Sequence, residues 1–430
     1  MIKIYQWKST SEEDKRRILQ RAALNIEEVK AEVQPWIDAV KEKGDEAVLA
    51  YIRKFDSPQF DASRLRVTED DVNRAYRETD PLVVRAIQQQ VELSRRHHQR
   101  HLQDGATFGE SVEGVLVGRR FNPVESAGLY VPAGKAPLPT VMQILGVAAK
   151  VAKVSRVAAC FPPTGNHHEI IIAADQAGVD EVYRVGGVAA IAAMAYGTAT
   201  IRPVAKIAGP GNIYVQAAKI LVFGQVSIDM PAGPSEAVIL ADGRANPTFI
   251  ASDILARAEH DENAAGVLIT WDPMIARETK RQVESQIVGL RRQDIIRTSL
   301  KRYSAIILVD SLEEAIDLTN EYAPEHLEIM TEYPWAVLER IKHAGSIFLG
   351  EFAPVAVGDY ASGTNHVLPT GGWARMFSAV GVDTFLKASE FQYLSRRGLQ
   401  NLQEIVEVIS AVEGLDAHGR SVTIRLENDR

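Results

Sequence analysis

Hydrophobic positions change their spacing near residue 126. Before it, apolar residues recur every three or four positions through 26–55 and 80–102, as in amphipathic helices. After it, short apolar runs rich in β-branched residues alternate with helical stretches as far as about residue 350. This alternation is typical of parallel sheets that helices cover on both faces. The last fifty residues return to a helical pattern and end in a polar, strand-like tail.

The candidate strands form two series. The first covers 128–132, 156–162, 181–187, 205–211 and 226–233, and the second covers 237–242, 266–270, 304–310, 326–331 and 346–350. Two similar series predict an α/β fold with two Rossmann-like parallel-sheet halves, a helical N-terminal region and a C-terminal helical tail. We expect the corresponding domains to span 1–115, 116–236, 237–380 and 381–430.

Composition narrows the class of protein. The 430 residues are 46% hydrophobic and 24% charged, as in globular proteins. The net charge of −8 disfavours nucleic acid and anionic membranes as partners, because both require a basic surface. No apolar run approaches the ~18 residues of a membrane span, and the first residues lack the apolar segment of a secretion signal. The single cysteine, Cys160, lies in an apolar run that predicts a buried thiol, and we expect a cytoplasmic protein.

The stretch 246–261 combines a predicted helix with candidate chemistry. It begins with an Asn-Pro pair, which is typical of helix starts. Arg257 and His260 lie three residues apart on one flank of its apolar stripe. One interpretation places His260 in the wall of a site. In the alternative, Asp253, Arg257 and Asp261 form a surface ion-pair ladder, and His260 is the cation that helix ends favour.

Two glycine turns follow predicted strands and open predicted helices. They are Gly186-Gly187 and the segment 209–212. The N–H groups at such helix starts can hold a phosphate. Neither turn completes the G-x-G-x-x-G pattern, because Tyr214 stands where the third glycine of the second turn belongs. Tight strand–helix turns without a ligand are the alternative for each.

Glu325 and His326 stand between a predicted helix and a predicted strand. Because they are adjacent, we expect their side chains to point in different directions and to act as independent groups. One of them could take a proton from an alcohol while the other orients a water. An ordinary surface loop is the alternative.

A polar loop at 358–369 contains few residues that favour helices or strands, and it is long for a connection without a function. Asp359 and His366 are its candidate metal-binding or substrate-binding groups. Glu413 and His418 form another acid and histidine near the C-terminus, where no core requires them.

These segments together resemble the signature blocks of the histidinol dehydrogenase family. The blocks are VESAGLYVPAGKAPLP, RVGG followed by AAIAAMAYGT, AGPGNIYV, DMPAGPSEAVILAD, ARAEHDENAAGVLIT, NEYAPEHLEI, GDYASGTNHVLPT and EGLDAHGRSV, in that order. The similarity covers nearly the whole chain. It implies a zinc enzyme that oxidises L-histidinol through a retained aldehyde to L-histidine in two NAD-dependent steps of histidine biosynthesis. It also implies a homodimer in which the C-terminal tail completes the partner's site.

The resemblance further implies a role for each matching residue. Glu325 would activate water for the second oxidation, and His326 would be the general base of both steps. The metal ligands would be His260, Asp359 and His418. The substrate would be held by Ser235, His366 and Glu413, in contact with His326, the metal-binding residues and Arg257. The dinucleotide would lie against Tyr130 and Asn212.

The chain departs from the family pattern at three places. The family's metal-binding glutamine falls on Arg257, its cofactor-contacting glutamine on Ala189, and its hydroxyl pair near the substrate on Thr140-Val141. A guanidinium stays charged and offers no lone pair, so Arg257 would repel zinc and could pair with Asp359. We therefore expect zinc binding to be weak or absent.

Two other functions stay open. A paralogue could oxidise another small alcohol or hydroxy acid with NAD, with Arg257 clamping an anionic group. A catalytically silent paralogue would serve as a binding subunit, although such a protein has no need of Glu325 and His326.

Overall fold

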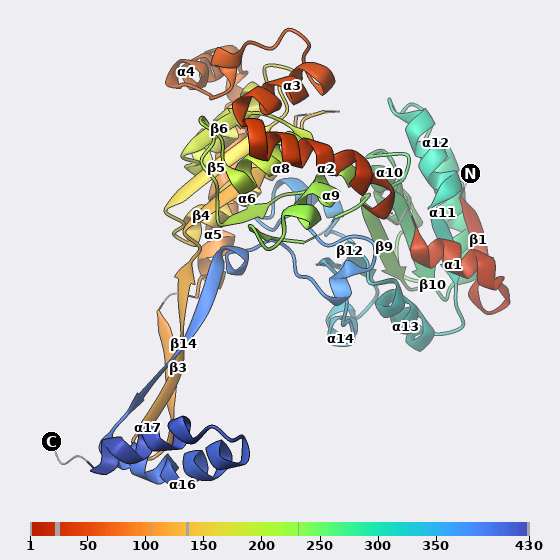
Figure 1. Cartoon of the computed structure of the whole chain (residues 1–430). Helices are drawn as coiled ribbons and strands as arrows, with labels where there is room; N and C mark the ends of the chain where they lie inside the picture. Colours follow the sequence, from red (N-terminus) through yellow and green to blue (C-terminus); the bar gives the residue numbers. More distant parts are fainter. Residues whose placement is uncertain (1, 22–25, 104, 135–136, 231, 428–430) are drawn as a thin grey trace. The chain divides into compact units, whose positions relative to one another are not determined.

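The computed structural model describes residues 2–21, 26–103, 105–134, 137–230 and 232–427 (Figure 1). The chain divides into two compact units, one formed by 1–101 with 125–385 and the other by 102–124 with 386–430. The first unit contains two parallel sheets with their covering helices, and the second contains an antiparallel sheet and a helical pair.

The first parallel sheet has the strand order β6-β5-β4-β7-β8. Its strands are β4 (Ser126–Tyr130), β5 (Arg156–Phe161), β6 (Glu181–Arg184), β7 (Lys206–Ala208) and β8 (Ser227–Ile228). One face shares a core with α2 (Ile26–Lys43), α3 (Asp45–Phe55), α8 (Gly187–Tyr196) and α9 (Ile213–Val222) (Figure 1). A second group of helices packs together and contacts the sheet through α6. It consists of α4 (Glu69–Glu78), α5 (Pro81–His101), α6 (Pro139–Val151) and α7 (His168–Ala177). Because helices cover the sheet, its strands β4 and β5 are largely apolar and buried, and Cys160 in β5 is buried as predicted.

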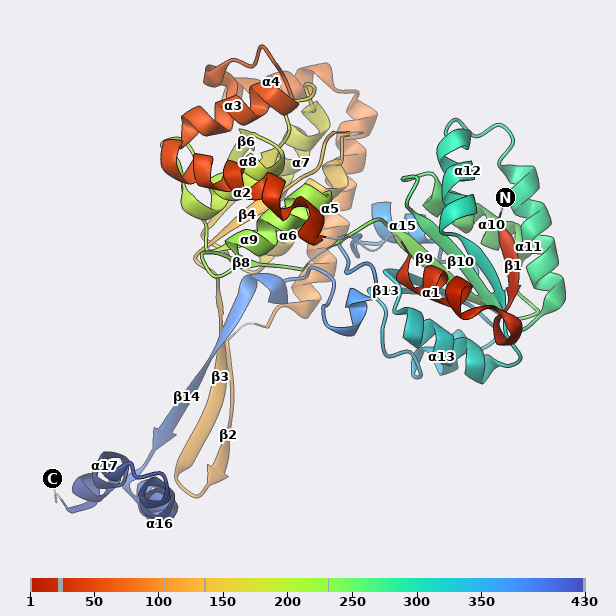
Figure 2. The same ribbon diagram turned by 45° about the vertical axis from the view of Figure 1, so that its right-hand side comes forward.

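The second parallel sheet has the order β1-β11-β10-β9-β12-β13. Its strands are β1 (Lys3–Gln6), β9 (Glu236–Ala241), β10 (Ala265–Thr270), β11 (Ala305–Leu308), β12 (His326–Met330) and β13 (Ser346–Leu349). One face packs against α10 (Pro247–Ala258), α11 (Pro273–Gln286) and α12 (Gln293–Arg302). The other packs against α1 (Glu12–Gln20) and α13 (Leu312–Tyr322) (Figure 2). The short helix α14 (Pro334–Leu338) packs on the same face. The short helix α15 (Val355–Tyr360) follows β13 and opens the polar loop.

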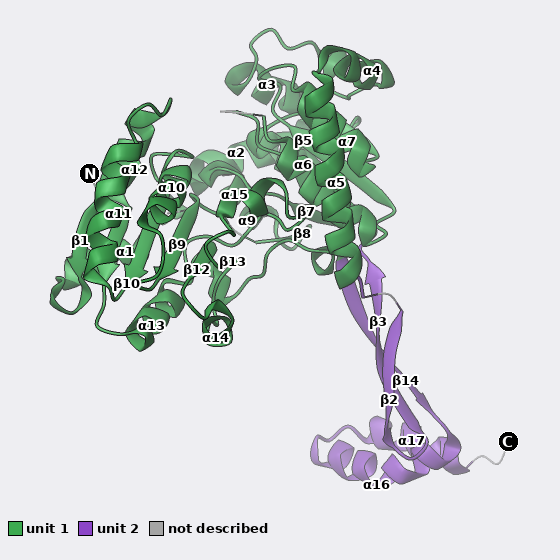
Figure 3. Cartoon of the chain, turned by 180° about the vertical axis from the view of Figure 1, so that it is seen from behind, with its two compact units in different colours: residues 1–101, 125–385 green, residues 102–124, 386–430 purple. Residues whose placement is uncertain are grey.

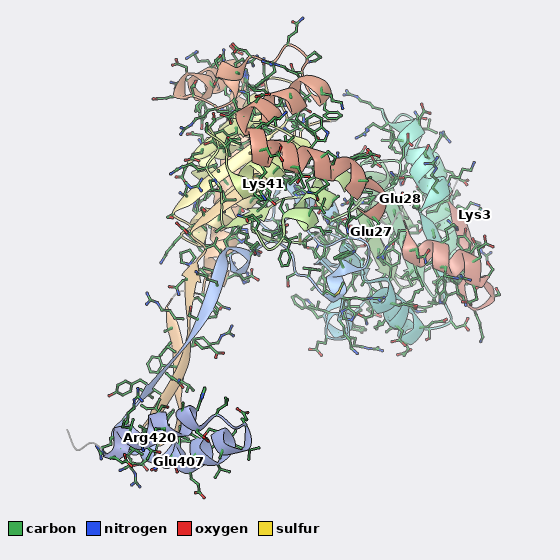
Figure 4. All side chains as sticks on the ribbon, viewed as in Figure 1. Lys3, Glu27, Glu28, Lys41, Glu407 and Arg420 are labelled. Atoms are coloured by element: carbon green, nitrogen blue, oxygen red, sulfur yellow. The ribbon has the colours of Figure 1, made fainter. Side chains whose placement is uncertain are left out.

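The second unit is built from segments far apart in the chain (Figure 3). Strands β2 (Ala106–Val112), β3 (Val115–Pro123) and β14 (Leu386–Leu394) form an antiparallel sheet in the order β14-β3-β2. Helices α16 (Arg396–Val412) and α17 (Asp416–Glu427) pack on each other, and Thr423 Oγ1 on α17 donates to Glu407 Oε1 on α16 at 2.7 Å (Glu407 is labelled in Figure 4).

Two local expectations for this unit are wrong. The segment 389–394 was expected to be helical but is part of β14, because β3 supplies its hydrogen-bonding partner. The polar end of the chain was expected to be strand-like but forms α17, because Val422 and Gly419 give it a buried side against α16.

The predicted fold class is confirmed, with two Rossmann-like parallel sheets, a helical N-terminal region and C-terminal helices. Short 3₁₀ turns complete the described elements at Trp7–Ser9, Ala62–Arg64, Trp373–Arg375 and Asp383–Phe385. Within the described ranges, no helix combines the length and the apolar character that crossing a membrane requires.

Candidate active site

The two parallel sheets contribute opposite ends of their strands to one region of the first unit. The first sheet contributes carboxyl ends, where Tyr130 closes β4 and the 209–212 turn follows β7. The second sheet contributes amino ends, because Ser235 directly precedes β9 and Glu325 directly precedes β12. Since β9 and β12 are parallel neighbours, the residues before them meet. Ser235 Oγ donates to Glu325 Oε2 at 2.7 Å, and the Glu236 N–H donates to the same oxygen at 2.8 Å.

Glu325 and His326 form a buried pair, with exposed fractions of 5% and 1%. His326 Nδ1 lies 3.3 Å from Glu325 Oε2 and 3.1 Å from the Glu236 carbonyl oxygen. The expectation that the two side chains act independently is therefore wrong. Glu325 precedes the first strand residue, and Ala323 has a left-handed φ of 50°, so the alternation of a regular strand does not apply to this pair.

The pair supports opposite charges. Burial alone would raise the pKa of Glu325, but the neighbouring His326, and then Arg257, hold it below its usual value. Burial also opposes protonation of His326, yet the Glu325 carboxylate raises the pKa of the imidazole. Each member of the pair therefore stabilises the charged form of the other.

Asp359, near the end of α15, links His326 to Arg257. Its Oδ1 lies 3.4 Å from His326 Nε2, and its Oδ2 accepts a hydrogen bond of 3.4 Å from Arg257 Nη2. The Asp359 pKa is lowered because these partners outweigh the effect of burial, with His326 contributing more than Arg257. Arg257 Nη1 also donates to Ser235 Oγ.

Arg257 is only 4% exposed. The interpretation of 253, 257 and 261 as a surface ion-pair ladder is therefore wrong. The side chain points to the interior from the last turn of α10, and its long aliphatic stem carries the charge to Asp359.

His260 and His366 border the same region. His260 lies just beyond α10, and although the residue as a whole is exposed, desolvation of its ring, together with the Arg257 charge, lowers its pKa to about 4. Burial lowers the pKa of His366, whose Nε2 lies 2.9 Å from Thr140 Oγ1.

These groups line a cavity of about 280 Å³ that adjoins a larger one. The smaller cavity is bordered by Thr140, Ser235, Arg257, His260, Glu325, His326, Asp359 and His366, among others. The larger cavity, of about 1080 Å³, is bordered by Trp36, Tyr51, Phe55, Asp56, Tyr130, Gly187 and Tyr214, among others. Asn212 and His260 border both. The larger cavity therefore adjoins the one that contains the buried Glu325–His326 pair.

Hydrogen bonds within the protein occupy the helix starts at both glycine turns. The Gly187 N–H donates to Tyr130 Oη at 3.1 Å, and the Val188 N–H donates to Tyr51 Oη at 3.3 Å. Gly187 has a φ of +57°, and a Cβ there would meet the Tyr51 hydroxyl at 2.2 Å. Asn212 Oδ1 accepts from the first N–H groups of α9. These contacts favour tight turns over phosphate sites at both positions.

The remaining predicted residues lie elsewhere. Ala189 is fully buried in α8 and does not border either cavity. Glu413 and His418 belong to the second unit and are exposed there. The structure therefore brings together the predicted residues of the first unit other than Ala189, and the roles of Glu413 and His418 stay predictions.

Sequence reasoning missed Glu236 and Arg21. Arg21 Nε lies 2.7 Å from Glu236 Oε2, and the guanidinium stacks on the Tyr322 ring at 3.6 Å. Glu236 Oε1 accepts from the Glu325 N–H at 3.2 Å, and burial raises the Glu236 pKa to about 7. Glu236 could have been found from the sequence, because a charged residue at the start of a buried strand is unusual. The sequence around Arg21 contains no comparable signal.

Comparison with known proteins assigns the family. The sequence model described as histidinol dehydrogenase matches residues 19–426. The chain belongs to the histidinol dehydrogenase family. Histidinol dehydrogenase of Methanothermobacter thermautotrophicus is 44% identical over 97% of this chain and 99% of its own, and that of Geobacter sulfurreducens is 46% identical over 95% and 96%. The crystal structure of histidinol dehydrogenase from Elizabethkingia anophelis matches with a TM-score of 0.94 and 36% identity over 99% of this chain and 98% of that one.

Membership of the histidinol dehydrogenase family implies NAD and zinc, and the residues present fit only the first. The larger cavity, of about 1080 Å³ and bordered by several aromatic side chains, has room for a dinucleotide. Zinc requires ligands with lone pairs, usually four. Of the expected ligands, His260 and Asp359 belong to the first unit and His418 to the second. A buried guanidinium instead lies against Asp359, which is the expected carboxylate ligand.

Proposed function

We propose that this protein oxidises L-histidinol through the aldehyde to L-histidine with NAD. The observation that carries the proposal is the buried group Glu325, His326 and Asp359 in a cavity that adjoins the larger, dinucleotide-sized one. The names of its relatives and the length of the match support the same reaction.

The reaction has two hydride transfers. In the first, the CH₂OH group loses a proton and a hydride, so that RCH₂OH and NAD⁺ give RCHO, NADH and H⁺. In the second, RCHO, H₂O and NAD⁺ give RCOO⁻, NADH and two H⁺. NAD supplies the hydride acceptor in both steps. The protein has to accept protons, add water to the aldehyde and hold the intermediate between the steps.

His326 is placed to accept the hydroxyl proton. Its Nε2 has no hydrogen-bond partner among the described residues, while Nδ1 faces Glu325 and the Glu236 carbonyl. Asp359 stabilises the imidazolium that forms, as carboxylates beside catalytic histidines do. For the second step, Glu325 orients a water molecule toward the aldehyde carbon, with Ser235 fixing the carboxylate.

Substrate binding and assembly complete the proposal. Ser235 and His366 contact the substrate from the first unit, and Glu413 contacts it from a partner subunit in a cytoplasmic homodimer. The apolar side chains on the exposed face of α16 support such an assembly, because a surface of this kind is stable when a second chain covers it.

Product stoichiometry tests the proposal. Purified protein incubated with limiting L-histidinol and excess NAD is expected to form two NADH per substrate and to yield L-histidine, identified by mass spectrometry. Glu325→Gln is expected to retain the first oxidation and to lose most of the second, leaving trappable aldehyde. Absence of NADH formation with L-histidinol would contradict the proposed function.

Arg257 favours a second candidate function. A buried guanidinium in the smaller cavity can bind a carboxylate or another anion bidentately, so a small hydroxy acid is the alternative substrate. NADH formation from a panel of hydroxy acids and small alcohols, with L-histidinol inactive, would support this alternative.

A further inference from the structure

Three buried polar atoms of the smaller cavity lack a hydrogen-bond partner among the described residues. They are Arg257 Nε, His326 Nε2 and Asp359 Oδ1. His326 Nε2 and Asp359 Oδ1 face each other at 3.4 Å, so Arg257 Nε is the atom of the three that points to a ligand, because buried polar atoms are usually satisfied. His326 Nε2 and Asp359 Oδ1 could serve a metal or a hydroxyl group. Arg257 Nε is a donor on a cation, and an oxygen acceptor of the ligand would satisfy it.

One of the remaining contacts of Arg257 is with Asp359, the carboxylate that a metal ion would otherwise hold. Arg257 Nη2 lies 3.4 Å from Asp359 Oδ2, and Nη1 donates to Ser235 Oγ. Arg257 is one helical turn from His260, the other ligand expected in this unit. An ion bound between His260 and Asp359 would therefore lie beside a permanent positive charge in a buried site.

We propose that the guanidinium of Arg257 replaces the divalent metal in this cavity, so that the enzyme binds and oxidises its alcohol without zinc. Arg257 holds Asp359 and Ser235 in place and donates a hydrogen bond to the substrate oxygen. The hydroxyl proton passes to His326, the hydride passes to NAD, and the guanidinium stabilises the negative charge that develops on the oxygen. The identity of that oxygen rests on the proposed function, whereas the exclusion of metal does not.

Metal content is the first test. Wild type, Arg257→Gln and the control Arg244→Gln would be purified as full-length chains, treated with chelator, incubated with zinc and analysed by elemental analysis after gel filtration. Arg244 is an exposed arginine of the same unit. We expect wild type and Arg244→Gln to hold far less than one zinc per chain, and zinc to leave their Tm unchanged. Arg257→Gln places an uncharged side chain with an oxygen lone pair at this position. We expect this variant to bind about one zinc per chain and its Tm to rise when zinc is added.

Turnover in metal-free buffer is the second test, with whichever alcohol the wild type oxidises. Chelator should leave wild-type kcat unchanged. Arg257→Gln should lose about 100-fold in kcat, as expected for removal of one charge-stabilising donor, and zinc should restore part of the rate in this variant alone. Arg257→Lys keeps a positive charge, and its kcat should lie between those of the wild type and Arg257→Gln.

Several results would overturn the inference. The first is that the wild type contains one zinc per chain and loses its activity in chelator. This result does not depend on the folding of any variant. Failure of a folded Arg257→Gln to take up zinc is another. Failure of the wild type to oxidise L-histidinol would contradict only the proposed function, because zinc content and Tm are measured without substrate.

Discussion

At Arg257, one side chain changes which ligands the cavity accepts without changing the fold. Glutamine and arginine share an aliphatic stem and similar helix propensity, so α10 accommodates either residue. Arginine adds a permanent charge in a site where Asp359 and Glu325 are both buried carboxylates. The ligand specificity of the cavity therefore depends on the charge at this position more than on the packing around it.

A neighbouring carboxyl pair gives a pH prediction. Burial raises the pKa of Asp253 to about 6, and burial together with Asp253 raises that of Glu328. Acids with a raised pKa bind more protons in the folded state, so stability falls as pH rises from about 4 through about 6. We compare the free energy of unfolding of Asp253→Asn with that of the wild type at the same pH. We expect this difference to favour the variant by about 1–3 kcal/mol more at pH 8 than at pH 4.5. Urea unfolding at both pH values measures this difference.

The matched control is Asp317→Asn on the exposed side of α13. Its stability relative to wild type should be the same at both pH values. A pH-independent effect of Asp253→Asn would contradict the assignment of the raised pKa to the folded state.

At the scale of single elements, periodicity predicted the strands and most of the helices around the site. The predicted helix at 246–261 corresponds to α10, and the predicted strand at 326–331 corresponds to β12. The positions of Arg257 and Glu325 on these elements could therefore be predicted. Their contacts could not, because Arg257 and Asp359 are 102 residues apart and meet only through the order of strands in the sheet.

The end of α1 gives an element-scale prediction. Arg21 follows this helix and pairs with Glu236 behind Glu325. Arg21→Gln would leave the Glu236 carboxyl buried without its counter-charge. At a pH well above the Glu236 pKa of about 7, where the group is ionised, we expect a loss of about 3–5 kcal/mol in the free energy of unfolding. In Arg21→Gln/Glu236→Gln the charge is removed together with its partner, so the loss should be smaller than the sum of the single losses.

Urea unfolding of the two single variants and the double variant measures this coupling. Activity is the second readout, because Glu236 positions the Glu325 backbone, and kcat should fall more than KM changes. Additive stability losses would show that the Arg21–Glu236 contact does not stabilise the fold.

At the scale of the whole molecule, local patterns identified the two parallel sheets but not the second unit. The apolar runs of the sheets are visible because helices cover both faces. Strands β2, β3 and β14 are largely exposed and lack such runs. Moreover, β3 and β14 are separated by more than 250 positions, as are β1 and β11, so no local signal predicts their pairing.

The exposed face of α16 yields a prediction about assembly. Ile405, Val408, Ile409 and Val412 follow the spacing of one helical face, and each is more than half exposed. The unit to which they belong buries few side chains of its own, so this apolar face gains stability only when another chain covers it. We expect a homodimer in solution, and we expect Ile409→Asp/Val412→Asp to be monomeric, because two buried, unpaired carboxylates would oppose association.

Light scattering after gel filtration measures the molar mass, with Glu404→Gln on the same helix as the control that stays dimeric. If Glu413 and His418 act in the partner's site, the monomeric variant should also lose most of its activity while keeping the Tm of its first unit. Molar mass tests whether α16 forms the dimer interface, and activity tests whether the partner's residues contribute to the active site. A monomer with full activity would confine catalysis to one chain, and an unchanged dimer would place the interface away from α16.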